Sequence, residues 1–396
     1  MRMLFLSTRF PFPPIGGERL RPFYFLKYLS RYWKITILSF SESEEESRQA
    51  KGHPFGDMEV DIITLPRLKS YWQCALGLLS HKPLEFFYYA EKKMQEAVRQ
   101  KLRTGAYDLI FCHLIRMAPY VEDVKGIKKV LDICDALSVR YELSSRLRRG
   151  PFRLVERSES RRLKTYEPMT AAKFDLNIVS SSLDKHYLEA RNDMHFLEVI
   201  ENGIEAEVLN RRNDNYDLHK IVFFGNFRIF HNVDAVRYFY ERILPLVKRR
   251  IKDVKFVVVG VSIPPCILKM KNDNSVSIYE DAADIRPFIE DACVSIAPMR
   301  VAAGIQNKIL QSMAYGVPVV TTSLGLGGIS AERNNDILVA DTPEDFAADI
   351  IMLMQDNELR KRIGNNAYSL IKKHYLWPDI CDNLNQKLTT LCYADK

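Results

Sequence analysis

One stretch of the sequence, AGIQNKILQSMAYGVPVV at residues 303–320, has residue types that could hold an anion. A loop containing Gly304 leads into a helix that we expect from about Asn307, with Lys308 in its first turn. A lysine there opposes the helix dipole unless an anion lies in front of it, so the sequence favours a phosphate site over an ordinary loop. Gly316 is expected to end the helix before a buried strand.

A second candidate phosphate site lies near the N-terminus, where Gly16 and Gly17 follow a proline-rich loop and directly precede a predicted helix. Glycine lets a backbone approach a phosphate closely, and a helix N-terminus supplies N–H groups and partial positive charge. A simple turn is the alternative. The apolar face of this helix is expected to include Leu20, Phe23, Tyr24 and Leu26.

A third candidate is the loop after the strand KIVFFG, in which Gly225 ends the strand and Arg228 follows. Arginine donates charge-assisted hydrogen bonds to phosphate, although an exposed loop arginine without a ligand is the alternative. The sequence contains no D-x-D pair and no histidine-rich cluster, so it implies no divalent metal.

Polar residues also follow two strands in the first half of the chain. His113 ends one strand and Arg116 follows it, while Asp132 and Asp135 lie at the end of the next. Carboxylates so placed can do acid and base work, and Asp135 could orient an acceptor hydroxyl. A hydrogen-bonded histidine at a sheet edge, and helix capping by Asp135 or Ser138, are the alternatives.

Elements that could position these residues recur along the chain. Short apolar runs alternate with amphipathic stretches, which predicts βα units around mostly parallel sheets. We expect an α/β fold with two Rossmann-like doubly wound domains, residues 1–200 and 201–375, and a C-terminal helix at 376–396 that crosses back to the first domain. Ligands of such sheets bind outside the carboxyl ends of the strands, so the site is expected where those ends face each other.

Composition limits the class of protein. The 396 residues are 47% apolar and 27% charged, which is typical of a globular protein. Seven cysteines without a metal-finger spacing predict reduced cytosolic thiols. The first apolar run is too short for a signal peptide, and no run reaches the roughly 18 residues of a spanning helix. A net charge of +7 permits attraction to nucleotides, nucleic acid or anionic lipid.

Six segments together resemble a known family of enzymes. They are RMLFLSTRFPFPPIGGERLRPFYFLKYLS, VIENGIEAEVL, FFGNFRIFHNVDAV, DIRPFIEDACVSIAPMR, GIQNKILQSMAYGVPVVTT and GIS, in this order over nearly the whole chain. The chain resembles a family 4 glycosyltransferase of the GT-B fold, closest to bacterial sugar transferases associated with exopolysaccharide and exosortase systems. The resemblance implies a nucleotide-sugar donor bound mainly by the second domain, an acceptor bound mainly by the first, and retention of anomeric configuration.

The resemblance also implies roles for particular residues. Gly16 would lie against the donor diphosphate, and Lys308 with the loop of Gly304, Ile305, Gln306 and Asn307 would grip that diphosphate and the sugar. Gln311 would face the ribose, and Asp281, Ala282 and Ile285 would lie beside the base. His113 resembles a strand-end histidine near the transferred sugar, and Arg116 is close by.

Two departures from the family pattern concern the charges at the site. Ala303 and Gln311 stand where the E-x7-E motif has glutamates, and a neutral contact to a ribose hydroxyl is roughly half as strong as a charge-assisted one. Asn226 and Asn232 stand where many members have an arginine and a lysine. Arg228 is expected to supply the missing charge.

The first domain has two unusual segments. Residues 146–167, RLRRGPFRLVERSESRRLKTYE, are the most basic part of the chain, and residues 70–90 are rich in aromatic and aliphatic side chains. Together they could hold the protein on an anionic membrane surface that presents a polyprenyl-diphosphate-linked sugar. A solvated, ion-paired helix is the alternative for the basic segment.

The sequence therefore predicts a cytoplasmic glycosyltransferase, peripheral to the inner face of the plasma membrane, that uses a UDP- or GDP-sugar and no cofactor to build polysaccharide. Its partners are expected to be the nucleotide sugar and a saccharide or lipid-linked acceptor. The alternatives are a glycosyltransferase-like binding protein that has lost turnover, motivated by Ala303 and Gln311, and a DNA-modifying sugar transferase. Nucleic acid is not expected as a partner of the main candidate.

Overall fold

The computed structural model describes residues 1–14, 16–190, 197–209 and 216–393. Contacts divide the chain into two units, Met1–Glu201 with Ile380–Lys396, and Asn202–Asp379. Within the described residues, no helix is both long and apolar enough to cross a membrane.

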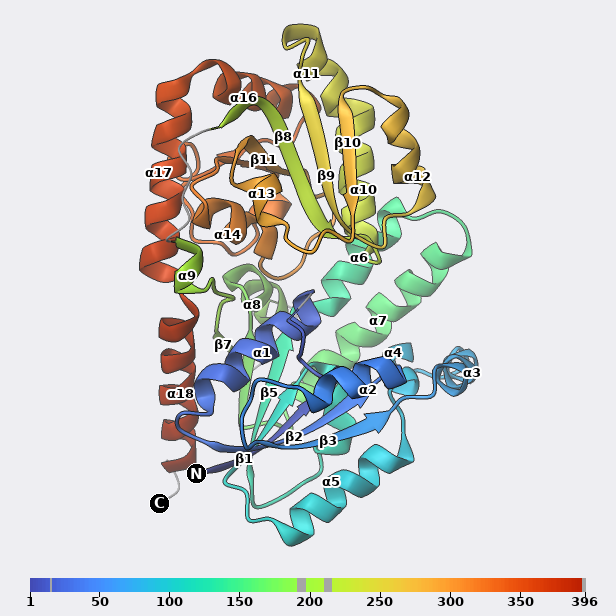
Figure 1. The fold of residues 1–396 in the computed structure, drawn as a ribbon. Coiled ribbons are helices and arrows are strands. Elements are labelled where there is room, and N and C mark those ends of the chain that lie inside the picture. Colours follow the sequence, from blue (N-terminus) through green and yellow to red (C-terminus); the bar gives the residue numbers. More distant parts are fainter. Residues whose placement is uncertain (15, 191–196, 210–215, 394–396) are drawn as a thin grey trace. The chain divides into compact units, whose positions relative to one another are not determined.

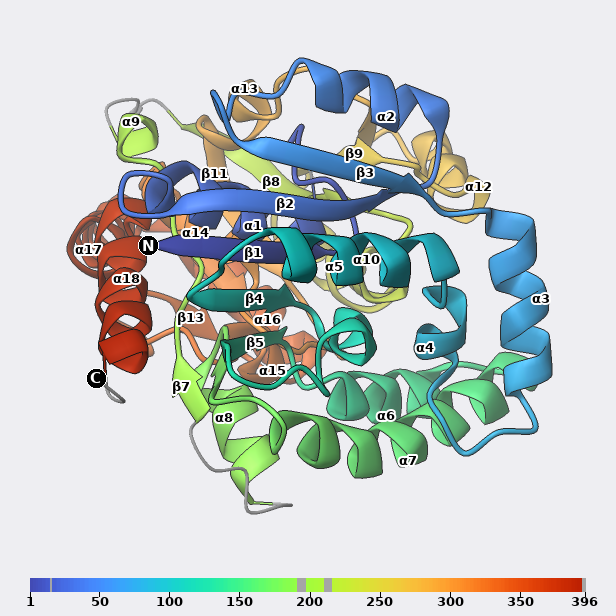
Figure 2. The same ribbon diagram turned by 90° about the horizontal axis from the view of Figure 1, so that it is seen from below.

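The first unit is built on a seven-stranded sheet in the order β3-β2-β1-β4-β5-β6-β7. Every pairing is parallel, as the alternation of apolar runs with helical stretches predicted. Figure 2 shows β3, β2, β1, β4 and β5 following one another across this sheet. The strands are β1 (Arg2–Ser7), β2 (Lys34–Ser41), β3 (Glu59–Thr64), β4 (Leu109–His113), β5 (Lys128–Cys134), β6 (Leu176–Val179) and β7 (Leu197–Val199).

Side chains of successive strand residues alternate between the two faces of this sheet, and each face is covered by helices. Phe5 and Phe111 stack on one face, where Phe25 of α1 packs edge-on against Phe111. The neighbouring Leu4 and Ile110 join the cluster that includes α5 on the other face. The helical elements are α1 (Gly17–Leu29), α2 (Glu44–Lys51), α3 (Arg67–Gly77), α4 (Leu84–Tyr88), α5 (Lys92–Thr104), η1 (Ile115–Tyr120), α6 (Leu137–Leu147), α7 (Pro151–Ala171) and α8 (Ser182–Glu189).

The predicted apolar face of α1 was largely wrong. Of the four residues expected on it, only Leu26 is buried, whereas the others are partly exposed. The residues that α1 buries are Arg21, Pro22, Phe25, Leu26, Tyr28 and Leu29. A charged residue takes a place on the inner face because a carboxylate of the sheet pairs with it, and hydrophobic periodicity cannot detect such a partner.

The last helix, α18 (Trp377–Tyr393), packs on the first unit. The indole N–H of Trp33 donates to Asn385 Oδ1 at 2.8 Å, and the hydroxyl of Tyr32 donates to Asp382 at 3.1 Å. Lys387 also pairs with Glu198 at 3.1 Å. These contacts fix the C-terminal helix beside α1 and the start of β2.

The second unit contains a six-stranded parallel sheet in the order β10-β9-β8-β11-β12-β13. Its strands are β8 (Asp217–Asn226), β9 (Lys255–Val261), β10 (Val276–Glu280), β11 (Ala292–Ala297), β12 (Val319–Thr321) and β13 (Leu338–Val339). Its helical elements are α9 (Ala206–Leu209), α10 (Phe230–Tyr238), η2 (Phe239–Ile243), α11 (Leu244–Arg250), α12 (Pro265–Leu268), η3 (Lys269–Asn272), α13 (Arg286–Ile289), α14 (Asn307–Ala314), α15 (Ser323–Leu326), α16 (Pro343–Gln355) and α17 (Asn357–His374). Figure 1 shows helices on both sides of β8, β9 and β11.

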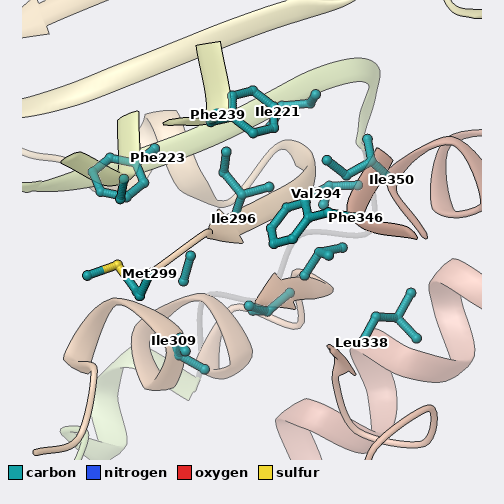
Figure 3. Close-up of a cluster of buried hydrophobic side chains, with 14 of the residues drawn as sticks. Ile221, Phe223, Phe239, Val294, Ile296, Met299, Ile309, Leu338, Phe346 and Ile350 are labelled. Atoms are coloured by element: carbon teal, nitrogen blue, oxygen red, sulfur yellow. The ribbon is translucent and has the colours of Figure 1, made fainter. Parts of the chain in front are cut away.

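The larger core of this unit lies on the face that Ile221 and Phe223 share (Figure 3). Phe239 and Phe346 meet there with ring centroids 6.5 Å apart, and Ile309 brings α14 into the same cluster. The alternate residues Val222 and Phe224 face a smaller cluster with Ile289 and Tyr315 on the opposite side of the sheet. The strands are therefore apolar on both faces, as expected of a sheet covered by helices on both sides.

Candidate functional site

The loops at the carboxyl ends of β8, β9 and β10 are joined closely to one another. The backbone N–H of Phe227 donates to Val261 O at 3.0 Å, and that of Asp281 donates to Gly260 O at 2.9 Å. A Cβ on Gly260 would lie 2.0 Å from the carbonyl oxygen of Gly225, so only glycine allows this approach. Three loops far apart in the sequence thus form one edge of the site.

Lys308 comes to the same edge from α14. Its ammonium lies 4.2 Å from the ring centroid of Phe223 and donates a short hydrogen bond to Asn232 Oδ1. The helix begins at Asn307, as predicted, and Gly316 follows its end with a φ of 71°. The helix therefore aims the cation at the loop between β8 and α10.

The electrostatic environment of Lys308 is unusual. Its partners are a π face and a neutral amide, which attract a cation but do not neutralise it. Burial lowers the pKa of Lys308 from its usual 10.5 to about 7, and no nearby carboxylate of the described chain opposes that shift. The site therefore has a desolvated ammonium that an incoming anion would stabilise.

Asn232 is a component of this site that sequence reasoning treated only as a departure from the family pattern. It is 4% exposed, its amide N–H₂ donates to Asn226 O at 2.8 Å, and its Oδ1 accepts a hydrogen bond from the Lys308 ammonium. A Cβ on Gly225 would lie 3.1 Å from its Nδ2. Asn232 thus fixes the position of the lysine relative to the glycine loop.

Arg228 lies in an exposed part of the same loop. Its Nε donates to Ser262 Oγ at 2.9 Å, and its backbone N–H donates to Asn226 Oδ1 at 3.0 Å. Ser262 has a φ of 57°, which places it in the tight turn after β9. Arg228 and Lys308 are therefore both connected to Asn226, Arg228 directly and Lys308 through Asn232.

The residue that follows strand β12 holds the loop from Pro298 to Gln306 in place. Thr322 Oγ1 donates to Met299 O at 2.6 Å, and Gly304 adopts a φ of 67° that few other residues tolerate. Ile305 and Gln306 are buried beside it. Asn307 Oδ1 accepts a hydrogen bond of 3.0 Å from Asn202, so the loop is also tied to the Asn-Gly segment at residues 202–203.

The remaining donor-site candidates lie on neighbouring elements of the second unit. Gln306 caps α14 without a side-chain hydrogen bond to its first-turn N–H groups. Gln311 is partly exposed on the same helix, and its amide has no hydrogen-bond partner among the described residues. Asp281 follows β10 with a φ of 52°, and Ala282 and Ile285 pack against the smaller apolar cluster.

In the first unit, His113 belongs to a buried hydrogen-bonded chain with Asp132 and Arg21. Its Nδ1 lies 2.8 Å from Asp132 Oδ2, and Asp132 also accepts from Arg21 Nε at 2.9 Å. Burial alone would raise the pKa of Asp132, but the Arg21 guanidinium and His113 bring it below its usual value. Arg21 also donates to Ile200 O at 2.7 Å.

The hydrogen bond to Asp132 determines which nitrogen of His113 is available. A carboxylate only accepts hydrogen bonds, so Nδ1 carries a proton and neutral His113 has an acceptor lone pair at Nε2. That Nε2 is buried and has no partner among the described residues. Asp132 is therefore an orienting group of His113, and its pairing with Arg21 was not predicted from the sequence.

The other candidates of the first unit have structural partners. Arg116 is 7% exposed and pairs with Glu85 and Glu18, each at 2.8 Å. Glu18 lies in the first turn of α1, and although burial opposes it, Arg116 lowers the pKa of Glu18 to about 2. The structure thus places a carboxylate close to the helix N-terminus that Gly16 begins.

The prediction that Asp135 or Ser138 caps α6 was wrong, because Ala136 is the N-cap and makes no side-chain cap bond. Asp184 accepts from the Ala136 N–H at 3.0 Å, and the Ser138 hydroxyl donates to Glu167 at 2.6 Å. Asp135 is partly exposed, with Ser180 Oγ at 3.4 Å and an Arg140 nitrogen at 4.0 Å.

The glycines before α1 differ in what they require. Gly16 is the N-cap with a φ of 87°, a conformation that side chains disfavour, whereas a Cβ on Gly17 would meet nothing within 4 Å. Gly17 is therefore not needed for packing. Among the residues that the structure describes, no group of three or more His, Cys, Asp or Glu side chains could hold a metal ion.

A hollow of about 770 Å³ lies elsewhere, lined by Arg250, Met352, Asn357 and neighbouring residues of α16 and α17. Arg250 ends the helix that precedes β9, and Asn357 follows α16, so the hollow adjoins the amino ends of the strands. Ligands of parallel sheets bind at the carboxyl ends, and none of the candidate residues lines this hollow.

Comparison with known proteins agrees with this architecture. Residues 219–356 match the family described as "Glycosyl transferases group 1". A Klebsiella pneumoniae protein described as "Uncharacterized 44.6 kDa protein in cps region" is 24% identical over 393 residues, 94% of this chain and 96% of that protein. An uncharacterized glycosyltransferase of Methanocaldococcus jannaschii is 34% identical over 76 residues, 19% of each chain.

Solved structures extend the likeness over the whole chain. Sucrose-phosphate synthase from Thermosynechococcus elongatus has a TM-score of 0.73 at 17% identity and covers 100% of both chains. Anabaena HepE, solved in complex with UDP and glucose, has a TM-score of 0.69 at 14% identity, covering 98% of this chain and 100% of its own. The fold is GT-B, with two Rossmann-like parallel-sheet units, and this prediction is confirmed.

Replacing Asp132 with asparagine should destabilise the protein by about 3–5 kcal/mol, because it leaves the Arg21 guanidinium buried without its counter-charge. Chemical denaturation of the two proteins side by side measures this difference. Glu241→Gln is the matched control, since its pair with Arg237 is exposed and should contribute less than about 1 kcal/mol. Equal effects of the two substitutions would contradict the importance of the buried pair.

The lowered pKa of Lys308 should appear as a pH dependence of stability. Between pH 7 and 10.5 the unfolded chain binds one more proton at this residue than the folded chain, so raising the pH favours folding. The free energy of unfolding of the unsubstituted protein, relative to Lys308→Met, should therefore increase from pH 7 to pH 9. A difference that stays constant over this range would show that Lys308 is not desolvated.

Proposed function

We propose that this chain is a glycosyltransferase that moves a sugar from a nucleotide-sugar donor to a saccharide or lipid-linked acceptor. The observation that carries the proposal is the Lys308 ammonium, which lies at the carboxyl-end edge of the second sheet with an aromatic ring and an amide as partners. This edge falls within the residues that match group 1 glycosyl transferases. A nucleoside diphosphate supplies the anion that the ammonium needs.

The donor diphosphate is proposed to lie against Lys308 and the loop of Gly304, Ile305, Gln306 and Asn307. Arg228 flanks this position from the next loop, and Gly225 leaves the approach open. On the first unit, Gly16 and Gly17 are proposed to contribute to donor binding at the N-terminus of α1, which the free space at Gly17 permits. Gln311, whose amide has no partner among the described residues, would bind a ribose hydroxyl, and the base would rest on the segment of Asp281, Ala282 and Ile285.

The reaction needs no protein nucleophile in this proposal. The bond between the anomeric carbon and the diphosphate oxygen breaks, a bond to the acceptor oxygen forms on the same face, and the acceptor proton passes to the leaving phosphate. Lys308 and the N–H groups at the start of α14 stabilise the charge that develops on the diphosphate. This assignment makes the chain a retaining enzyme in which protein cations and dipoles take the place of a divalent metal.

His113 is proposed to orient the transferred sugar. Asp132 fixes its proton on Nδ1, so Nε2 accepts a hydrogen bond from a sugar hydroxyl. Asp135 is proposed to bind an acceptor hydroxyl, because its carboxylate is partly exposed. Arg116 is already paired with two carboxylates, so we propose that it shapes the acceptor site by positioning Glu18 and Glu85.

The biological setting is proposed from two further observations. The Klebsiella pneumoniae relative, which covers nearly the whole chain, is described as lying in a cps region, and this supports a role in polysaccharide assembly. The seven cysteines form no disulfide within the described part of the chain, which supports a reducing, cytoplasmic location. UDP- or GDP-sugars are the proposed donors, and solved relatives of the fold contain UDP.

A glycosyltransferase-like binding protein without turnover is the second candidate. Ala303 and Gln311 favour it, because both positions lack the carboxylates of the family pattern. Such a protein would bind a nucleotide sugar and be stabilised by it, but would release no nucleoside diphosphate.

A panel of UDP-, GDP- and ADP-sugars should separate the two candidates. We expect release of nucleoside diphosphate, unchanged by EDTA, and a rate about 100-fold lower in Lys308→Ala because a preorganised charge donor is lost. Thermal stabilisation without release would favour the binding protein. A Lys308→Ala enzyme with full activity would refute the role of the lysine.

Restoring a carboxylate at position 311 should tighten donor binding. Gln311→Glu introduces an acceptor that makes a charge-assisted hydrogen bond to a ribose hydroxyl, about twice as strong as the neutral one. Calorimetric titration with UDP or GDP measures the change, and Gln355→Glu on α16, distant from the site in the same unit, controls for added negative charge. Weaker binding by the Gln311 variant would mean that the glutamine is adapted to a different contact.

A further inference from the structure

Helix α3 presents its large apolar side chains to solvent. Leu68, Trp72 and Leu76 recur every fourth residue of α3 and are exposed by 81%, 74% and 74%, and Leu79, two residues after the helix, is exposed by 95%. The residues that α3 buries are the small Ser70 and Gly77. A surface helix normally buries its apolar side. The exposed apolar side chains of α3 do not contribute to a core, so this reversed pattern is typical of a binding surface.

The packing beneath α3 holds the apolar side outward. A Cβ on Gly77 would lie 2.6 Å from the ring of Phe87, so the glycine lets α4 pack directly on the inner side of the helix. Arg162 of α7 donates to Leu78 O at 2.8 Å and pairs with Glu159 at 3.0 Å. Helix α3 is thus anchored by its inner face to α4 and α7.

A basic stripe begins at Arg149, just before α7, and continues along the first half of that helix. Arg149, Arg153, Arg157 and Arg161 recur every fourth residue, and all four are exposed. None of them has an ion-pair partner within the described part of the chain. The alternative of a solvated, ion-paired helix is seen in both of its parts, because these four arginines are exposed and Arg148 pairs with Glu156.

Further apolar and cationic residues complete the surface. Phe152 and Leu154 at the start of α7 are exposed by 64% and 69%. Residues 65–84 contain three Lys or Arg and no acidic residue. Figures 1 and 2 both show α3 and the turn between α6 and α7 along the same edge of the first unit.

We propose that this surface, α3 with the start of α7, docks the protein on an anionic lipid bilayer. The apolar residues of α3 enter the boundary between headgroups and acyl chains, where tryptophan and tyrosine are favoured, and the arginines meet the anionic headgroups. The unpaired arginines favour a lipid surface over a second copy of this basic chain. This docking deepens the proposed function. It rests on that function only where it points to a lipid-linked acceptor.

Cosedimentation of the full chain with vesicles tests the docking without any measure of activity. We expect binding to vesicles of phosphatidylcholine with 30% phosphatidylglycerol, weakening with added salt, and little binding to phosphatidylcholine alone. The variant Trp72→Ser/Leu79→Ser should bind about 10-fold more weakly. So should a variant in which Arg149, Arg153, Arg157 and Arg161 are each changed to glutamine.

Matched controls come from exposed residues of the second unit. Leu218→Ser/Met352→Ser removes two exposed apolar side chains, and changing Lys252, Lys271, Lys361 and Arg362 to glutamine removes the same charge. Both controls should bind as the unsubstituted protein does, and all variants should keep its unfolding temperature because the changed side chains are exposed.

Three outcomes would overturn the proposal. They are no binding of the unsubstituted protein to anionic vesicles, equal losses in the controls, or a self-associating protein whose oligomers are dissociated by Trp72→Ser/Leu79→Ser. Donor turnover, measured separately with a soluble acceptor, reports on the proposed function alone, so failure of one does not mimic failure of the other.

Discussion

The candidate site of the second unit depends on one electrostatic constraint, a partly buried lysine amine with no carboxylate of the described chain beside it. Phe223 and Asn232 hold Lys308 in place but leave its charge uncompensated. Burying this charge without a counter-charge costs free energy. The lysine lies at the carboxyl-end edge of the sheet, where the glycines at 225 and 260 bring three loops together. An anion bound at this edge would offset that free-energy cost, which is why a diphosphate is the proposed ligand.

In the first unit, by contrast, the buried charges are paired with each other. Arg21, Asp132 and His113 are buried together, where the Arg21 and Asp132 charges pair with each other and His113 is hydrogen-bonded to the carboxylate. This pairing joins α1 to the sheet and to the end of the unit at Ile200 and Glu201. It leaves one polar atom, His113 Nε2, without a partner among the described residues, and the proposed sugar contact would use that atom.

The two departures from the family pattern have different consequences in the structure. Asn232 stands where the resembled family has a lysine, but its side chain accepts a hydrogen bond from Lys308, so a cation still reaches the loop after β8 from α14. Arg228, expected to supply that charge, is exposed and bonded to Ser262. At Gln311, no carboxylate of the described chain is bonded to the side chain and could take the place of the glutamate of the family pattern. The affinity for the donor therefore depends on what the Gln311 amide contacts.

Hydrophobic periodicity by itself determined the strands, the parallel sheets and the start of α14 at Asn307, because these follow from local alternation and from the coverage of both sheet faces. It also placed Gly225, Lys308 and His113 at strand ends or helix starts. Only the tertiary structure decided that Asn232 meets Lys308 and that Arg21 meets Asp132. It also decided that the apolar side of α3 faces solvent. Such pairings join residues 76 to 111 positions apart, and the spacing of residues along a chain does not encode them.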